Sequence, residues 1–294
     1  MTTRHSYGWI PYLAPSLILI LAIAIWPLGY AAWLATHDFS PLLPFDPPFV
    51  GLGMFDLAFS EPRFWNGLRV TVILLVGGLL LQGSLALGLA LLLARQDIVG
   101  RRLMMMIAFL PAFINPIATG YIFRLLFSPQ GGPINAFLSI ITRQDVSIDW
   151  IGEPTPAIIA VLIADTWQWT PFLTVIFLAG IINLRREPYE AARLDRASAW
   201  QVLRAITMPA IAALVVVMLV IRGIEIVKIF DTIFALTAGG PGTSTETLSF
   251  YAYQVGFKSF ELSYAAAISW FLLVVVVIAS LILFKTGARN LFRI

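Results

Sequence analysis

The sequence predicts an all-α membrane protein with six transmembrane helices and both termini in the cytoplasm. Of its 294 residues, 59% are hydrophobic and 12% are charged, whereas soluble domains are about 45–50% apolar and about 25% charged. Six apolar stretches approach the roughly 20 residues that a helix needs to cross a bilayer. This composition excludes a soluble globular enzyme, a disordered protein and a nucleic-acid-binding protein.

The expected spans follow one another with short connections. The first is longer than the roughly 7–15-residue apolar core of a cleaved signal peptide, so we expect it to be a retained anchor. No segment has the composition of a linker, so the sequence predicts one transmembrane domain over residues 1–294. The six spans are about 10–36, 68–94, 103–127, 157–182, 209–231 and 264–284.

The distribution of basic residues orients this bundle. With the N-terminus inside, 12 of the 19 Lys and Arg residues fall in the cytoplasmic segments and three in the outer segments. Because cytoplasmic loops carry the excess of Lys and Arg, we expect an N-in, C-in topology. The cytoplasmic segments are then 1–9, 95–102, 183–208 and 285–294, and the outer segments are 37–67, 128–156 and 232–263.

The outer segments contain residues that interrupt regular structure, and the first of them, 37–67, is rich in proline. In the second outer segment, Ser128-Pro-Gln-Gly-Gly-Pro133 predicts a turn, and a short helix is expected near residues 134–141. In the third, Gly239-Gly-Pro241 breaks the chain where it leaves the fifth span.

The cytoplasmic segment 183–208 has the composition of a short surface helix. Pro188 suits a first helical turn, and Glu187 and Glu190 favour the positive end of a helix. Ala191 and Ala192 are small enough to let another surface approach closely. Charged residues surround them. These residues allow two interpretations, a helix that docks against a partner protein or an amphipathic connector on the membrane surface.

A motif in this segment resembles the EAA loop of ABC-importer permeases. Glu190-Ala-Ala is followed by Asp195 and Ala197, and the segment ends Ile206-Thr-Met-Pro. The resemblance implies that this loop forms the helix that couples the permease to an ATPase subunit. The family has Gly where this chain has Arg196, so the turn is absent or strained here, or the helix continues. The implied coupling residues are Glu190, Ala191, Ala192, Asp195, Arg196 and Ala197.

A second motif is similar to the signature of carbohydrate-type importer permeases. It runs from Phe230-Asp231 to Gly239-Gly-Pro241 with Thr245 after it, and Ser263-Tyr-Ala-Ala-Ala resembles the entry into the last helix. The resemblance implies the type I (MetI-like) permease fold of the binding-protein-dependent, maltose/glycerol-phosphate-type family, in a bacterial inner membrane. It also implies three kinds of partner: a second homologous permease, two ATP-binding-cassette ATPase subunits and an extracytoplasmic solute-binding protein.

The fourth span carries polar groups at membrane depth, where ionisable residues default to functional hypotheses. Asp165, Gln168 and Trp169 lie three and four residues apart, and Phe172 follows. Carboxylates and amides hydrogen-bond hydroxyls, and aromatic rings pack on apolar faces, which suits a polyhydroxylated ligand. The alternative is that Asp165 pairs with a basic residue and holds helices together.

The fifth and third spans add further candidates. Arg222, Glu225, Lys228 and Asp231 recur at three-residue spacing with alternating sign, which predicts either an ion-pair ladder or a polar wall of the translocation path. Arg222 and Glu225 are the deepest of these, so both are path candidates. In the third span, the sequence Asn115-Pro116 predicts a kink. Asn115 and Thr119 are path candidates, and Tyr121 and Arg124 are typical of interface anchors.

The residue types also limit the chemistry. The chain has no cysteine, two histidines and no phosphate-binding G-x-x-x-x-G-K-[ST] motif. We therefore expect no catalytic residue, no metal site and no cofactor in this chain, with ATP and Mg bound by the partner ATPases. The expected function is import of a sugar, oligosaccharide or polyol.

Three alternatives remain open. A permease for glycerol-3-phosphate or a related phosphodiester is favoured by Arg222 and disfavoured by Asp165 and Glu225. An intramembrane enzyme would need a catalytic constellation at matched depth. A simple channel would leave the EAA loop without a role.

Overall fold

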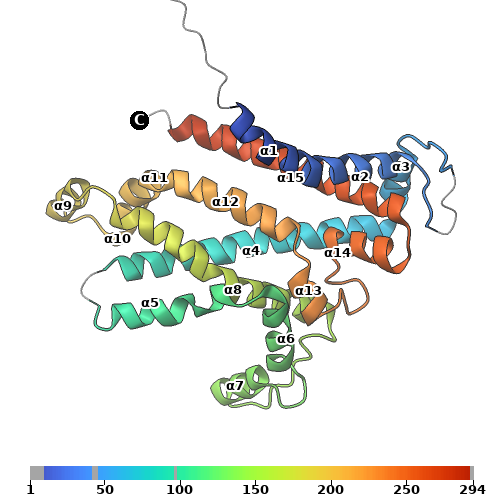
Figure 1. Ribbon diagram of the computed structural model, residues 1–294. Helices are drawn as coiled ribbons and strands as arrows, with labels where there is room; N and C mark the ends of the chain where they lie inside the picture. Colours follow the sequence, from blue (N-terminus) through green and yellow to red (C-terminus); the bar gives the residue numbers. More distant parts are fainter. Residues whose placement is uncertain (1–9, 42–45, 96–97, 292–294) are drawn as a thin grey trace, which may run out of the picture. The chain divides into compact units, whose positions relative to one another are not determined.

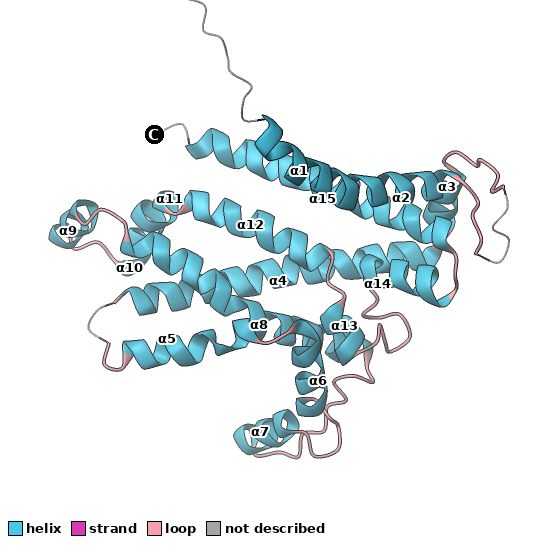
Figure 2. Ribbon diagram, in the orientation of Figure 1, coloured by secondary structure: helices cyan, strands magenta, loops and turns pink. Residues whose placement is uncertain are grey.

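The computed structural model describes residues 10–41, 46–95 and 98–291, and this part of the chain is helical almost throughout. The described residues contain no strand, and His37 and Phe49 form an isolated antiparallel bridge (Figure 2). The predicted all-α class is confirmed. The orientation in the bilayer and the single-domain assignment remain predictions.

Four helices are long and apolar enough to cross a membrane unaided. They are Tyr12–Thr36, α4 (Pro62–Ala94), α8 (Pro154–Ile182) and the apolar part of α15 (Leu262–Leu291). The first of these combines α1 (Ile10–Ile20) and α2 (Trp26–Thr36) through a π-helical turn at Leu21–Ile25. All four match spans predicted from the sequence.

The other two predicted spans are bent pairs of helices rather than straight rods. The third is made of α5 (Arg101–Phe109), extended by a 3-10 turn to Phe113, and α6 (Pro116–Leu126), which meet at 102°. Pro116 has no N–H to continue the preceding helix, and Asn115 caps α6 by accepting a hydrogen bond from the Ile117 N–H at 2.9 Å. The predicted kink at Asn115–Pro116 is confirmed. With each pair counted as one span, the described residues contain six.

The fifth predicted span is shorter than expected, and this is a correction. Helix α12 covers Ala212–Val227, after a 69° bend from the short helices between Ala199 and Ala210. The expected stripe of four charged residues along one helix is therefore wrong, because Asp231 begins a separate helix, α13 (Asp231–Leu236). The chain breaks here because Phe230 stacks on Phe250 at 5.7 Å between ring centroids, and the Ile229 carbonyl accepts from the Thr247 hydroxyl.

Short helices occupy the connecting segments. As predicted, α7 (Pro133–Thr142) follows the Gly-Pro turn and α9 (Glu187–Leu194) occupies the EAA segment. The remaining elements are α3 (Gly53–Ser60), α10 (Ala199–Val202), α11 (Met208–Ala210), α14 (Leu248–Tyr253) and two π-helical segments, Leu203–Thr207 and Gln254–Lys258 (Figure 1).

The described chain forms two compact units, and residues 1–62 with 252–273 make the smaller one. Its core packs Leu34 and Ala35 of α2 against Ala266 and Ala267 of α15. The Ser263 hydroxyl accepts a hydrogen bond from the Phe39 N–H at 2.9 Å. Ser263 belongs to the predicted entry into the last helix, so this entry is fixed to the chain that follows α2.

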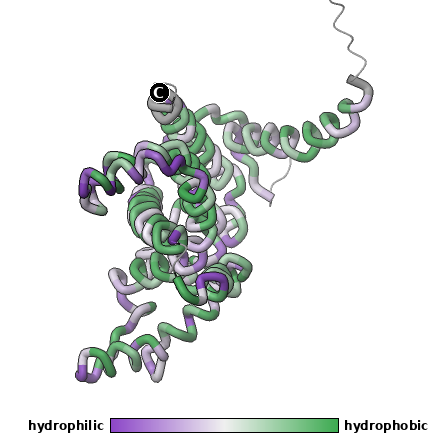
Figure 3. Tube along the Cα trace, turned by 90° about the vertical axis from the view of Figure 1, so that its left-hand side faces the viewer, coloured by the Kyte–Doolittle hydropathy of each residue, from purple (hydrophilic) through white to green (hydrophobic). Residues whose placement is uncertain are grey.

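The larger unit contains residues 63–251 and 274–294, and its core lies between α4, α8 and α12. Small residues let these helices approach: a Cβ at Gly78 would lie 2.9 Å from Ile226, and one at Gly83 would lie 2.9 Å from Met218. Its long helices are mostly hydrophobic, and hydrophilic residues gather in connecting segments (Figure 3). The core includes Ala86, Ala90, Leu93, Leu173, Phe177, Leu178, Ile211 and Met218.

Candidate functional site

Three buried polar side chains from α4, α8 and α12 form a closed triangle. Asp165 of α8 pairs with Arg222 of α12. Gln82 of α4 donates from Nε2 to Asp165 Oδ2 at 2.7 Å and accepts from Arg222 Nε at Oε1 at 2.6 Å. The exposed fractions are 4% for Asp165, 2% for Arg222 and 0% for Gln82. A charge in a low-dielectric interior is tolerated when it is paired and hydrogen-bonded, and this triangle meets both conditions.

Trp169 lies one helical turn beyond Asp165 and contacts the same guanidinium. The Arg222 Cζ atom is 4.6 Å from the centre of the indole ring, which is cation–π geometry. The ring of Phe172 meets Trp169 edge-on, with centroids 6.1 Å apart and planes at 86°. The buried triangle therefore also fixes the orientation of a half-buried aromatic ring.

Trp169 and two members of the triangle, Asp165 and Arg222, line a cavity of about 290 Å³. A second ion pair, between Lys228 Nζ and Glu225 Oε1 at 2.9 Å, lies in its more exposed part. The cavity thus combines hydrogen-bonding carboxylates, two cations and aromatic rings. Its lining residues are Pro116, Asp165, Trp169, Arg222, Glu225, Lys228, Ile229, Phe230, Asp231 and Thr232.

Some of the predicted path residues lie elsewhere, at the bend between α5 and α6. Gln168 donates from Nε2 to the carbonyl oxygen of Ile114 at 2.7 Å, so its amide supports the bend rather than the cavity. Asn115 caps α6, and Thr119 is buried on the same helix. Four of the eight predicted path residues, Asp165, Trp169, Arg222 and Glu225, line the cavity, and Phe172 contacts one of them.

Gln82 was not among the candidate residues predicted from the sequence, although the sequence does indicate that it is unusual. It is the one amide in the apolar sequence of the second span, and a buried amide needs hydrogen-bond partners. Nothing in the sequence indicates which helix supplies them. Pro116 and Thr232 were also missed as cavity residues, because the predicted kink before α6 does not show which helices its start will face, and the break before α13 was not predicted.

The EAA helix α9 ends in a Schellman motif, with Arg196 in the left-handed position. Arg196 has a φ of 53°. The Ala197 N–H donates to the Ala192 carbonyl at 2.9 Å and the Arg196 N–H donates to the Arg193 carbonyl at 3.1 Å. These are the 6→1 and 5→2 bonds of that motif. The turn normally made by Gly is therefore present here, on a residue for which this conformation is strained.

The residues of this turn present a compact surface. Ala192 is buried, whereas Glu190, Ala191, Asp195 and Arg196 are exposed and Ala197 is half-buried. Leu194 is 86% exposed and Trp200, at the start of α10, is 67% exposed. Apolar side chains exposed beside a small flat face are typical of a surface that another protein covers. The Tyr189 and Thr207 hydroxyls hydrogen-bond at 3.1 Å, which ties α9 to the chain leading into α12.

The predicted outer loop around Gly239-Gly-Pro241 is held by a partly buried ion pair. Arg63 Nε donates to Glu246 Oε2 at 3.0 Å, and its guanidinium lies 4.9 Å from the ring centre of Tyr251. Asn66 donates to the Thr243 carbonyl at 2.8 Å. Burial raises the pKa of Glu246, and the hydrogen bond and charge of Arg63 oppose that rise. This loop is therefore fixed to the start of α4.

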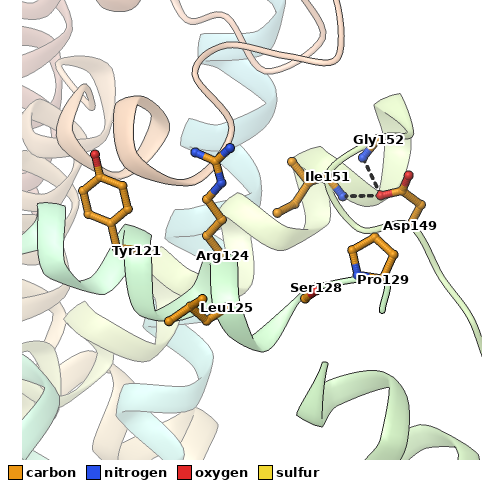
Figure 4. A pocket seen from close by; sticks show the side chains of 8 residues that line it. All are labelled: Tyr121, Arg124, Leu125, Ser128, Pro129, Asp149, Ile151 and Gly152. Atoms are coloured by element: carbon orange, nitrogen blue, oxygen red, sulfur yellow. Dashed lines mark hydrogen bonds between the residues drawn. The ribbon is translucent and has the colours of Figure 1, made fainter. Parts of the chain in front are cut away.

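A second hollow of about 560 Å³ lies at the end of α6 (Figure 4). Tyr121 and Arg124, predicted as interface anchors, lie on its wall. Asp149 lies there too, but its Oδ1 accepts from the Gly152 N–H at 2.7 Å and so shapes the turn before α8. This hollow shares no lining residue with the Asp165 cavity.

Comparison with known proteins relates the chain to membrane transport components. A family model described as binding-protein-dependent transport system inner membrane component matches residues 85–289. The chain is 32% identical over 273 residues to the trehalose/maltose transport system permease protein of Thermococcus litoralis, covering 93% of this chain and 91% of that relative. It is 29% identical over 286 residues to the lactose transport system permease protein of Rhizobium radiobacter, covering 96% and 94%.

A solved structure shows the same architecture. A chain in the crystal structure of a bacterial ABC transporter involved in the import of the acidic polysaccharide alginate aligns with a TM-score of 0.81 and 25% identity, covering 96% of both chains.

Proposed function

We propose that this chain, which belongs to the family of binding-protein-dependent transport system inner membrane components, is the permease through which an ATP-driven importer takes up a sugar, oligosaccharide or polyol. The family and the membrane location are established by the matches above. The substrate class is supported by relatives named for trehalose, maltose and lactose transport.

One observation carries the substrate class: Trp169 is presented to a polar cavity by a fully paired buried network. Its ring can pack on the apolar face of a sugar, while carboxylates around it accept hydrogen bonds from hydroxyls. Three carboxylates and two cations line the cavity, and Arg222 is already neutralised by Asp165. This balance does not favour the phosphate group of glycerol-3-phosphate.

The position of α9 supports the proposed partners. Helix α8 ends at Ile182, five residues before α9 begins at Glu187, and the chain after α9 leads into α12. A partner that moves α9 would therefore act on the two helices that carry Asp165 and Arg222. We assign to α9 the role of contacting one of two ABC ATPase subunits. These subunits would bind ATP and Mg. A second permease would complete the path, and a solute-binding protein would deliver the substrate.

In this mechanism, ATP binding in the partners moves α9 and the cavity alternates between the two sides of the membrane. The Asp165–Arg222–Gln82 triangle keeps α4, α8 and α12 together during that movement. It also holds Trp169 in place, because the ring rests on the guanidinium of Arg222. The residues of this chain thus bind and orient the substrate, and the energy comes from the partners.

The experiment is uptake of labelled trehalose, maltose and glycerol-3-phosphate by the complete importer, reconstituted with its binding protein. We expect Trp169→Ala to reduce sugar uptake roughly tenfold, about 1.4 kcal/mol, with the complex intact. The matched control is Trp167→Ala on the same helix, because Trp167 contacts Phe123 instead, with ring centroids 5.4 Å apart. Equal uptake by the two variants would contradict the assignment of the cavity, and uptake of glycerol-3-phosphate alone would contradict the substrate class.

A further inference from the structure

Helix α7 has its polar side turned toward the protein. Asn135 is buried; its Nδ2 donates to the Ile148 carbonyl at 2.9 Å and its Oδ1 accepts from Trp150 Nε1 at 2.8 Å. One turn later, the Ser139 hydroxyl accepts from the Val146 N–H at 2.9 Å. The polar stripe of the helix is therefore used to fasten it to the loop that follows.

The opposite side of α7 is apolar and exposed. Phe137, Ile140 and Ile141 are 62%, 76% and 62% exposed. Their spacing places them on one face of a helix, and α7 itself contains no charged residue. In a helix that rests on a protein in water, the apolar face is the one that is buried. The reversed arrangement indicates that something other than water covers α7.

We propose that α7 lies in the interface of the bilayer, on the predicted outer side, with Phe137, Ile140 and Ile141 inserted among the lipid chains. Lipid chains offer no hydrogen bonds, so every polar group at that level must be satisfied within the protein. The side chains of Asn135 and Ser139 have partners in the following loop, and the Thr142 hydroxyl donates to the Leu138 carbonyl at 2.8 Å.

The exposed face of α7 favours lipid over a protein partner as the material that covers it. A protein interface carries about one hydrogen bond per 100–200 Å² and a polar rim, but the side chains of the exposed face of α7 provide neither donor nor acceptor. An amphipathic helix in the membrane interface needs only an apolar face and polar anchors.

The surroundings of α7 fit the same position. Six residues join it to α6, so its start lies within about 24 Å of Leu126 by chain reach. Helix α6 itself exposes apolar residues, including Ile122 and Leu125. Arg143 follows α7 directly and is exposed, and a long basic side chain there can reach lipid headgroups. Apolar residues are therefore exposed both on a predicted span and on the nearby helix α7.

The absence of cysteine from the sequence allows a direct test in the complete importer in lipid nanodiscs. Phe137→Cys, Ile140→Cys and Ile141→Cys each receive a nitroxide label, and electron paramagnetic resonance compares collisions with oxygen and with a water-soluble nickel chelate. The matched control is Gln144→Cys, which lies beyond the helix and is exposed.

We expect the three labels on α7 to collide more with oxygen than with the chelate, and the Gln144 label to show the reverse. Use of three positions keeps the test decisive if one variant fails to fold. Preferential collision with the chelate at positions 137, 140 and 141 would place α7 in water and overturn the proposal. Low collision with both reagents would mean that a protein partner covers α7, and would overturn it as well.

Discussion

Arg222 of α12 and Asp165 of α8 form an ion pair in which both side chains are almost completely buried. Removing one partner of such a pair leaves an uncompensated charge, which costs about 3–5 kcal/mol. Replacing all members of a buried ionic network by apolar residues is often neutral. The pair therefore makes the stability of the larger unit depend on both residues together.

The first prediction concerns this pair. We expect Asp165→Ala to lower the stability of the reconstituted complex by about 3–5 kcal/mol, measured as its thermal unfolding in lipid nanodiscs. The triple variant Asp165→Leu, Arg222→Met and Gln82→Leu should recover most of that loss, because no buried charge or amide remains unpaired. If the single variant unfolds like the parent, the pair does not hold the helices.

The second prediction concerns the left-handed turn after α9. Arg196→Gly should stabilise the turn by about 1 kcal/mol, because Gly adopts a positive φ without the steric cost to Cβ. Hydrogen exchange of residues 187–202 measures the local effect. The matched control is Arg193→Gly inside α9, which should lose about 1 kcal/mol of helix stability. Faster exchange in the Arg196→Gly variant would show that the arginine side chain itself stabilises the turn.

The third prediction is a pH dependence at the outer loop. Burial raises the pKa of Glu246 above its ordinary value of 4.5, so the folded state binds the proton more tightly than the unfolded chain. The stability linked to this group is therefore present below about pH 4.5 and is lost as the pH rises through the raised pKa.

Hydrogen exchange of residues 237–247 at several pH values, corrected for the intrinsic exchange rate, measures this effect. We expect weaker protection at neutral pH than at mildly acidic pH. Glu246→Gln is the control, because it keeps an oxygen that accepts from Arg63 but does not titrate, so its corrected protection should not change with pH. A pH dependence that is the same in both proteins would assign the effect to another group.

The fourth prediction concerns the bend between α5 and α6. Gln168→Leu removes the donor to the half-buried Ile114 carbonyl, and the loss of one such hydrogen bond costs about 1 kcal/mol. Thr166→Val on the same helix is the control, because the buried Thr166 hydroxyl has no partner among the described residues. Thermal unfolding should show a loss for the first variant and no loss for the second. Equal unfolding temperatures for the two variants would mean that the bend does not depend on Gln168.

The local amino-acid sequence was sufficient to predict many of the helices. Hydrophobic length predicted the straight spans α4, α8 and α15, because a helix that crosses a bilayer must satisfy its own backbone and expose apolar side chains. Asn115-Pro116 predicted the kink before α6, and Pro188 with its neighbouring acids predicted α9. Each of these features depends on residues that are adjacent along the chain.

Only the tertiary structure determined the partners of the polar groups. Asp165 and Gln168 lie three residues apart, yet one pairs with Arg222 and the other supports the bend at Ile114. Asp231 lies at the same three-residue spacing as the charged residues of the fifth span. It nevertheless begins another helix, because the helix ends before Phe230, which stacks on Phe250 of α14. The periodicity of a sequence identifies which residues share one face of a helix. The hydrogen-bond or ion-pair partner of a residue on that face, such as Gln82 for Asp165, is distant in the sequence and is determined only when the helices pack.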